Sequence, residues 1–281
     1  MDIKEKNIKI LIAMHKPYKV PVDSMYVPLQ VGAALHERIK MSDCRDDASP
    51  DEYLLTDNLG DNISAKNPYY CELTAMYFAW KNLTCDALGL VHYRRYFGVD
   101  RHAKTLDDKL KCIFKKTEID ALLDEYDILV PKKRNYYIES LYSHYAHTFD
   151  GMHLDMAADI IRNRFPEYAQ FIDPVYKSSK GCMFNMFIMK RKYVDDYCYF
   201  LFSVLCEMED KLDLSSMDDF NKRLFGRVSE ILFNVWLAKQ LDCGVAVKEL
   251  PHMHMEPVNW IKKGSSFLSA KFLGKKYTKS F

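Results

Sequence analysis

The segment ALGLVHYRRYF, residues 87–97, combines a short apolar run with a cationic and aromatic end. An apolar run of about four to eight residues between polar neighbours is typical of a buried β-strand. A second run of this kind, IKILIAM, occupies residues 8–14 and is followed directly by HKPY. We therefore predict two buried strands, each of which leads into basic and aromatic side chains.

Helical and strand-like segments alternate along the rest of the chain. Residues 67–82 show the clearest helical pattern, since Asn67 can cap the helix and Pro68 suits its first turn. Residues 22–40 predict a loop that leads into a short helix, and residues 41–62 predict a polar surface loop. We expect further helices at 117–126, 154–165, 193–211 and 227–240, and further strands at 127–131, 182–190 and 245–250.

This alternation predicts a doubly wound or mixed α/β sheet. The chain has 281 residues, which fits one α/β domain over residues 1–260 and a basic, aromatic tail over residues 261–281. Such a tail can lie on an anionic membrane surface, or it can be a solvated terminus. Both interpretations of the tail stay open.

The overall composition excludes several classes of protein. Forty basic and thirty-nine acidic residues give a net charge of +1, without the basic excess that is usual in nucleic-acid binders. The eight cysteines form no C-x-x-C pair, and no signal peptide or membrane-spanning apolar stretch is present. We therefore expect a cytoplasmic protein with reduced thiols.

Basic clusters follow three of the predicted strands: His15-Lys16, His92–Arg95 and Lys132–Arg134. Ligands of α/β sheets bind at the carboxyl ends of strands, so this recurring placement predicts a site. Arg94 and Arg95 could bind a diphosphate in the bidentate manner of guanidinium groups and stabilise it as a leaving group. Alternatively, one arginine faces solvent and the other bonds acidic neighbours. Neither G-x-G-x-x-G nor a P-loop occurs, which disfavours dehydrogenases and kinases.

Other polar residues are weaker candidates. Asn185 lies within the predicted strand 182–190, where its amide either bonds backbone groups or faces a ligand. Glu230 would fall in the first turn of the helix at 227–240. There its carboxylate either interacts favourably with the helix dipole or serves as a base. Short polar side chains before the helix at 67–82 could bind an anion or simply cap the helix: Asp61, Asn62, Ser64 and Asn67.

Evidence for a metal site is limited. His252 and His254 alternate on a predicted extended segment, so both would face one side and could bind a divalent ion. No D-x-D sequence stands at a strand end to add carboxylate ligands. We therefore assign no metal-ligating residue, and a divalent cofactor, Mn or Mg, stays open.

In their order along the chain, these segments resemble a known family. The chain is similar, from about residue 8 to residue 260, to the bacterial capsular and exopolysaccharide glycosyltransferases that were long catalogued as a domain of unknown function. The resemblance implies a GT-A-like nucleotide-diphospho-sugar transferase fold with a mixed, mostly parallel sheet flanked by helices. The matching segments are HK-x-Y, DNISAKN, CELTAMYFAWKN, HYRRYF, DILVPK, NMFIMK and FGRVSEILFNVWL.

This resemblance implies transfer of a hexose from a nucleotide-sugar donor to a saccharide or polyprenyl-diphosphate-linked acceptor, at the inner face of the plasma membrane. It places cations, from His92 to Arg95, where other GT-A enzymes carry D-x-D. It implies that Asn185 lines a sugar and that Glu230 is the catalytic base, with Arg94 and Arg95 as its catalytic partners. Further residues are implied to bind the nucleotide-sugar: His15, Lys16, Tyr18, Asp61, Asn62, Ser64, Asn67, His92 and Tyr93.

Two alternatives remain in competition. A nucleotidyltransferase or phosphotransferase could use the same basic strand ends, but it would need a carboxylate pair for magnesium, which is not obvious in the sequence. A non-catalytic, membrane-associated carbohydrate-binding protein would depend on its aromatic residues more than on Arg94 and Glu230.

Overall fold

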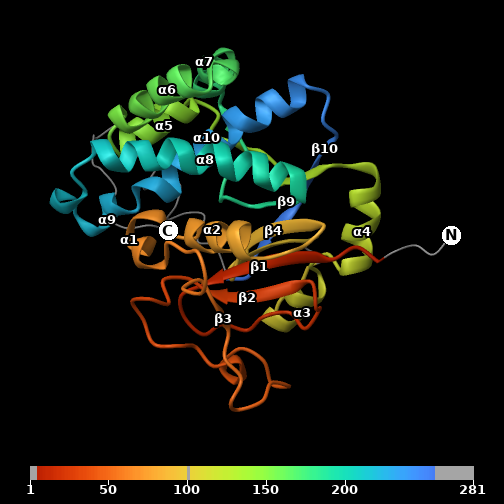
Figure 1. Cartoon of the computed structure of the whole chain (residues 1–281). Helices are drawn as coiled ribbons and strands as arrows, with labels where there is room; N and C mark the ends of the chain where they lie inside the picture. The colour runs from red at the N-terminus through yellow and green to blue at the C-terminus, as the bar shows by residue number, and fades with distance from the viewer. Residues whose placement is uncertain (1–4, 100–101, 257–281) are drawn as a thin grey trace.

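The computed structural model describes residues 5–99 and 102–256 as one mixed sheet with helices on both faces (Figure 1). The predicted tail and the domain boundary at residue 260 lie outside the described residues. In the described part of the chain, no helix has the length and apolar character needed to span a membrane.

The two strands predicted first lie side by side in the centre of the sheet. β1 (Ile8–Met14) pairs in parallel with β4 (Ala87–His92). On one side of β1 the sheet continues through β2 (Tyr26–Gln30) and β3 (Leu55–Thr56). Beyond β4 it continues through β9 (Phe187–Lys190), β6 (Ile128–Pro131) and β10 (Val247–Leu250), and only β9 of these is antiparallel to its neighbours.

Short strands extend this framework. β5 (Arg95–Phe97) folds back from β4 and pairs with β11 (His252–His254). β7 (Arg134–Asn135) and β8 (Lys180–Gly181) form a separate ladder. Since β1, β4 and β6 point the same way, their carboxyl ends lie at one edge of the sheet.

The sheet separates two hydrophobic cores, because alternate side chains of a strand face opposite sides. From β1, Leu11 and Ala13 face one core, whereas Ile10 and Ile12 face the other. The first core packs against α2 (Leu73–Asn82), α5 (Leu141–Thr148), α6 (Met152–Arg164), α7 (Ala169–Lys177), α8 (Arg191–Lys211) and α10 (Leu224–Asp242) (Figure 1). The second packs against α3 (Leu106–Lys111) and α4 (Lys116–Glu125).

The remaining elements are single turns. They are α1 (Asn67–Tyr70), α9 (Asp219–Lys222), η1 (Met41–Asp43), η2 (Ser64–Lys66), η3 (Pro166–Tyr168) and η4 (Leu214–Ser216).

The structure corrects several local expectations. Residues 26–30 form β2 instead of a loop, because they are mostly buried and pair with β1, and residues 31–35 form turns instead of the expected short helix. The helix expected at 67–82 breaks at Cys71, whose φ is 54°, and Asn67 does not cap it but lies inside α1. The strand expected at 182–190 begins only at Phe187. Glu230 falls in the second turn of α10, because that helix begins at Leu224.

The order of the strands creates a switch point. After β1 the chain builds β2 and β3 on one side, and it then returns to place β4 on the other side of β1. In open α/β sheets a crevice forms at the carboxyl ends of strands where the order reverses in this way, and ligands bind there.

Candidate active site

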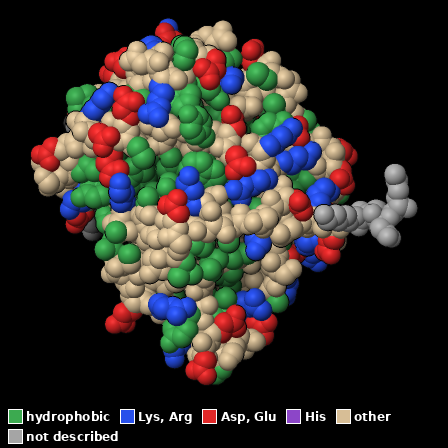
Figure 2. Space-filling view, viewed as in Figure 1, with side chains coloured by type: hydrophobic (Ala, Val, Ile, Leu, Met, Phe, Trp, Pro, Cys, Tyr) green, Lys and Arg blue, Asp and Glu red, His purple; other side chains and the backbone are tan. Residues whose placement is uncertain are grey.

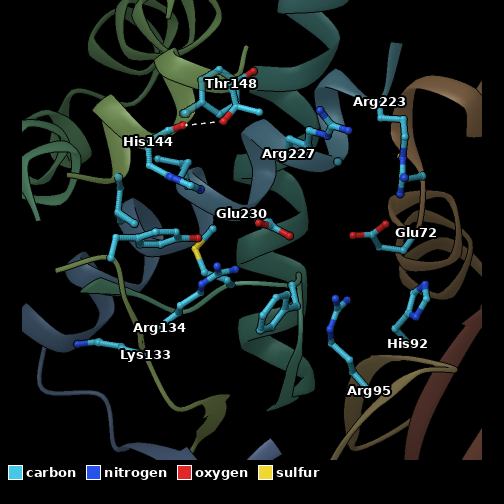
Figure 3. Close-up of a pocket in the computed structure, with 18 of the residues that line it drawn as sticks. Glu72, His92, Arg95, Lys133, Arg134, His144, Thr148, Arg223, Arg227 and Glu230 are labelled. Atoms are coloured by element: carbon cyan, nitrogen blue, oxygen red, sulfur yellow. Dashed lines mark hydrogen bonds between the residues drawn. The ribbon is translucent and has the colours of Figure 1, made fainter. Parts of the chain in front are cut away.

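A cavity of about 780 Å³ lies at the carboxyl edge of the sheet, beneath helices α5 and α10 (Figure 3). This volume is within the usual range for small-molecule sites. Residues that follow β4 and β6 line it, together with residues of α10 and β11. The edge of the sheet predicted from the basic clusters is therefore the edge that carries the cavity.

The charge of the cavity is strongly one-sided. Within the described residues, seven cationic side chains and two carboxylates line it: Arg94, Arg95, Lys132, Lys133, Arg134, Arg223 and Arg227, with Glu72 and Glu230. The chain as a whole carries a net charge of +1, and Figure 2 shows both signs scattered over one face of the molecule. The concentration of positive charge is therefore local, as expected of a site for an anionic ligand.

Arg94 lies in the tight turn between β4 and β5 and Arg95 is the first residue of β5, but their surroundings differ. Arg95 points into the cavity toward Glu72 and Glu230 (Figure 3), and its guanidinium lies 4.4 Å from the centre of the Phe184 ring. Burial lowers the pKa of Arg95, and its buried Nε has no hydrogen-bond partner among the described residues. Arg94 is more exposed, and its Nη1 lies 3.5 Å from Oε2 of Glu256.

Glu230 projects from α10 into the middle of the cavity (Figure 3). Burial, followed by the neighbouring charge of Glu72, raises the pKa of Glu230 to about 7. Arg95, Arg134 and the backbone N–H of Phe184 oppose this rise, because each stabilises the carboxylate. A carboxyl group with a pKa near 7 is well suited to accept a proton from a hydroxyl group at neutral pH.

The turn at Phe184 and Asn185 holds both carboxylates. Phe184 donates its N–H to Glu230, and Asn185 donates its Nδ2 to Oε1 of Glu72 at 2.7 Å. Asn185 also donates to the carbonyl of Gly226 at 2.8 Å, while its Oδ1 accepts the Ser229 hydroxyl at 3.0 Å. Both turn residues have positive φ, 77° and 51°, and backbone strain of this kind often marks functional sites.

Replacing Asn185 with alanine should lower the free energy of unfolding by about 1–3 kcal/mol, because Gly226 and Ser229 lose a buried partner. Alanine also tolerates a positive φ poorly, whereas glycine adopts it readily. Asn185→Gly should therefore be more stable than Asn185→Ala by about 1 kcal/mol, because a Cβ costs about 1–2 kcal/mol in the left-handed region while glycine loses more backbone entropy on folding. Urea unfolding followed by circular dichroism measures both variants, and unchanged stability in both would refute the assigned hydrogen bonds.

Residues after β1 gather beside the cavity and do not line it. The rings of His92, Tyr18 and His15 lie 4.4, 5.1 and 5.4 Å from the Tyr93 ring, and Nζ of Lys16 lies 5.7 Å from its centre. Tyr93 is 1% exposed, so it supports these neighbours instead of offering its own surface to a ligand. Burial, and then the charge of Arg95, lowers the pKa of His92 well below its ordinary value, which keeps this cavity-lining ring neutral.

The four polar residues expected before the helix do not reach the cavity. Ser64 is buried and bonds to the carboxylate of Asp57, which also accepts the N–H groups of Gly32 and Ala33. The backbone of Asp61 bonds to Asn82, at the end of α2 that lies away from Glu72. Asn62 bonds to Gly60 and Ser64, and Asn67 to Cys71 and Thr74. Asn185 likewise bonds protein groups behind the cavity wall.

The family model described as Domain of unknown function (DUF4422) matches residues 9–241. The chain belongs to this family. Its fold is similar to the apo structure of WbbM, a bifunctional glycosyltransferase, with a TM-score of 0.79 and 30% sequence identity. The likeness covers 89% of this chain and 46% of that chain, so this chain spans about half the length of WbbM. No curated protein matches the chain. The family resemblance and the GT-A-like fold expected from the sequence are both confirmed.

In this DUF4422 chain, the site includes residues that the sequence argument did not assign. Glu72 was hidden within an apparently continuous helix, and the break at Cys71 places it at the start of α2. Arg223 and Arg227 precede Glu230 by seven and three positions, a spacing that puts all three on one helical face. That periodicity could have indicated that both arginines line the cavity together with Glu230. The sequence analysis identified Lys132–Arg134 as a basic cluster after a strand but predicted no binding or catalytic role for it.

The described residues of this DUF4422 domain do not fit a Mn or Mg site. His252 and His254 both line the cavity, as their alternation predicted, with ring centres 6.0 Å apart. Among described residues, however, no three His, Cys, Asp or Glu side chains gather as metal ligands. Magnesium and manganese prefer oxygen ligands, and here the two carboxylates lie among seven cations.

Proposed function

We propose that this chain is a glycosyltransferase that moves a hexose from a nucleoside-diphospho-sugar to the hydroxyl group of a saccharide acceptor. The observation that carries this proposal is the position of Glu230, a carboxyl group with a pKa of about 7 between the guanidinium groups of Arg95 and Arg134. The similarity to a bifunctional glycosyltransferase structure supports the class of reaction.

In the proposed reaction, the acceptor oxygen forms a bond to the anomeric carbon while the bond from that carbon to the diphosphate breaks. Glu230 takes the proton of the attacking hydroxyl. The departing nucleoside diphosphate gains negative charge, and Arg95, with Arg94 at the rim, stabilises it by fixed positive charge. The cationic side chains thus supply the charge neutralisation that D-x-D-bound metal ions supply in other GT-A enzymes.

The nucleotide is proposed to lie over the switch point between β1 and β4. His15, Lys16 and Tyr18 follow β1 and surround Tyr93 next to Arg94, where base and ribose can reach them while the diphosphate meets Arg95. On the sequence resemblance, we further propose a role in capsule or exopolysaccharide synthesis with a lipid-linked acceptor at the inner membrane face.

The competing functions have less support. A nucleotidyltransferase or phosphotransferase would need carboxylates free to ligate magnesium, whereas Glu72 and Glu230 lie among seven cationic side chains and no third acidic, His or Cys ligand gathers with them among the described residues. A non-catalytic sugar-binding protein would have no use for a carboxyl group whose pKa is raised to the pH of proton transfer.

Isothermal titration calorimetry with UDP-, GDP- and CDP-linked hexoses tests the proposed function. We expect the sugars linked to one of these three nucleotides to bind at least tenfold more tightly than the corresponding free nucleoside, because their diphosphate contacts Arg94 and Arg95. Arg162→Ala is the matched control, since Arg162 lies on α6 and pairs with Asp159 and Asp173. If no nucleotide-sugar binds more tightly than its nucleoside, the proposed function is wrong.

A further inference from the structure

Five of the seven cationic side chains of the cavity come from two separate places in the sheet, and the other two, Arg223 and Arg227, lie at the start of α10. Arg94 and Arg95 follow β4, whereas Lys132, Lys133 and Arg134 follow β6. Strand β9 lies between β4 and β6, and neighbouring strands are about 4.8 Å apart, so the two groups start about 10 Å apart. These five side chains therefore form two groups of positive charge at the edge of the sheet.

Glu230 lies between these groups. Figure 3 shows its carboxyl group between Arg134 on one side and Arg95 on the other, with Glu72 facing it from the far wall. An anion that contacted both groups at once would have to pass the Glu230 carboxyl group, which repels it when ionised. Two anionic groups, one on each side of Glu230, match the charges of the cavity better than a single diphosphate does.

The position of the reaction decides which side of Glu230 belongs to the donor and which to the acceptor. If Glu230 accepts the proton of the acceptor hydroxyl, the donor and the acceptor meet beside it. The switch point between β1 and β4 puts the donor diphosphate on the side of Arg94 and Arg95. The side of Arg134 is then left for the acceptor.

Arg134 is well placed to bind a second anionic group. Its backbone is held in the β7–β8 ladder opposite Gly181, and its guanidinium lies 4.7 Å from the centre of the Tyr136 ring. Within the described part of the chain, Arg134 forms no ion pair with an acid, while Lys133 has only a 3.7 Å contact to Glu249. The planar donors of arginine bind phosphate and carboxylate groups in a bidentate manner.

We propose that Arg134, with Lys132 and Lys133, forms a second anion subsite that binds an acidic group of the acceptor, either a phosphate or a carboxylate. Its assignment to the acceptor depends on the proposed function, whereas the existence of a second anion subsite depends only on the geometry of the cavity. The acceptor is thus an acidic saccharide or a saccharide linked to a phosphate. Tyr137, which also lines the cavity and is 82% exposed, offers an apolar surface beside the subsite.

Calorimetry tests this subsite with two pairs of probes, on protein saturated with the nucleoside diphosphate that binds in the titrations above; UDP stands for that nucleotide below. Farnesyl phosphate is compared with farnesol, and glucuronic acid with glucose. We expect one acidic probe to bind at least tenfold more tightly than its neutral partner while UDP stays bound. The pair that shows this preference distinguishes a lipid phosphate from an acidic sugar as the source of the anion.

Variants assign the effect to residues. Arg134→Ala should abolish the preference for the acidic probe and change UDP affinity less than twofold, whereas Arg95→Ala should weaken UDP and preserve that preference. Arg134→Lys should retain part of it, and Arg162→Ala all of it. Melting temperatures of all variants establish that they fold.

Three results would overturn the second subsite: displacement of the acidic probe by UDP, absence of any acidic preference, or equal loss of UDP and acidic probe in Arg134→Ala. The proposed function fails separately. If nucleotide-sugars do not bind but the acidic probe binds through Arg134, the anion subsite stands and the glycosyltransferase proposal falls.

Discussion

Replacing Glu230 with glutamine should lower kcat by about 100- to 10,000-fold, the usual contribution of a general base. Glutamine keeps the size of the side chain but cannot take the proton of the acceptor hydroxyl. Donor affinity should change less than threefold, because the cations that hold the diphosphate remain. Steady-state kinetics give kcat, and calorimetry with the nucleotide-sugar gives the affinity.

The pH dependence of the reaction checks the same assignment. Only the carboxylate form of Glu230 can act as a base, and its pKa is about 7. The logarithm of kcat/KM should therefore rise as pH increases toward about 7 and level off above it, and this limb should vanish in Glu230→Gln. Glu125→Gln, an exposed substitution at the end of α4, serves as the control. A parallel loss of donor binding and rate, or a pH limb that persists without Glu230, would show that this residue has a structural role.

Replacing Arg95 with alanine should reduce donor affinity or kcat by more than tenfold and leave the fold intact. Arg95 points into the cavity, and its low exposure means that little water screens its charge. Its buried Nε has no hydrogen-bond partner among the described residues, so truncation leaves no such partner unsatisfied and the melting temperature should change little. Nucleotide-sugar titrations and steady-state kinetics measure the loss.

Arg94→Ala provides the internal comparison. Arg94 is more exposed, and Glu256 partly neutralises its charge. We therefore expect the drop in donor affinity or kcat in Arg94→Ala also to exceed tenfold, but to be smaller than the drop in Arg95→Ala. Arg95→Lys should recover part of the activity, because it keeps the charge without the bidentate geometry. Near-normal turnover in both alanine variants would remove the role assigned to these arginines.

The sequence by itself determined the central strands and the edge of the sheet that carries the cavity. Runs such as residues 8–14 and 87–92 form strands because their own apolar side chains need burial on both faces, which is a local property. The basic residues that follow them stand at strand ends for the same reason. Arg94 and Arg95 could therefore be predicted before the structure was seen, and so could the family resemblance.

Only the tertiary structure decided how the carboxylates and the second group of cations are arranged. Glu72 and Glu230 are far apart in sequence. They meet because Asn185 donates a hydrogen bond to Glu72 and the neighbouring Phe184 donates one to Glu230. The positive φ of Cys71 and Phe184 goes against the local preference of these residue types, so no local pattern predicts it. Likewise, Arg134 and Arg95 lie on opposite sides of Glu230 because β9 inserts between β6 and β4. A pairing of strands that are distant in sequence leaves no local periodicity from which it could be predicted.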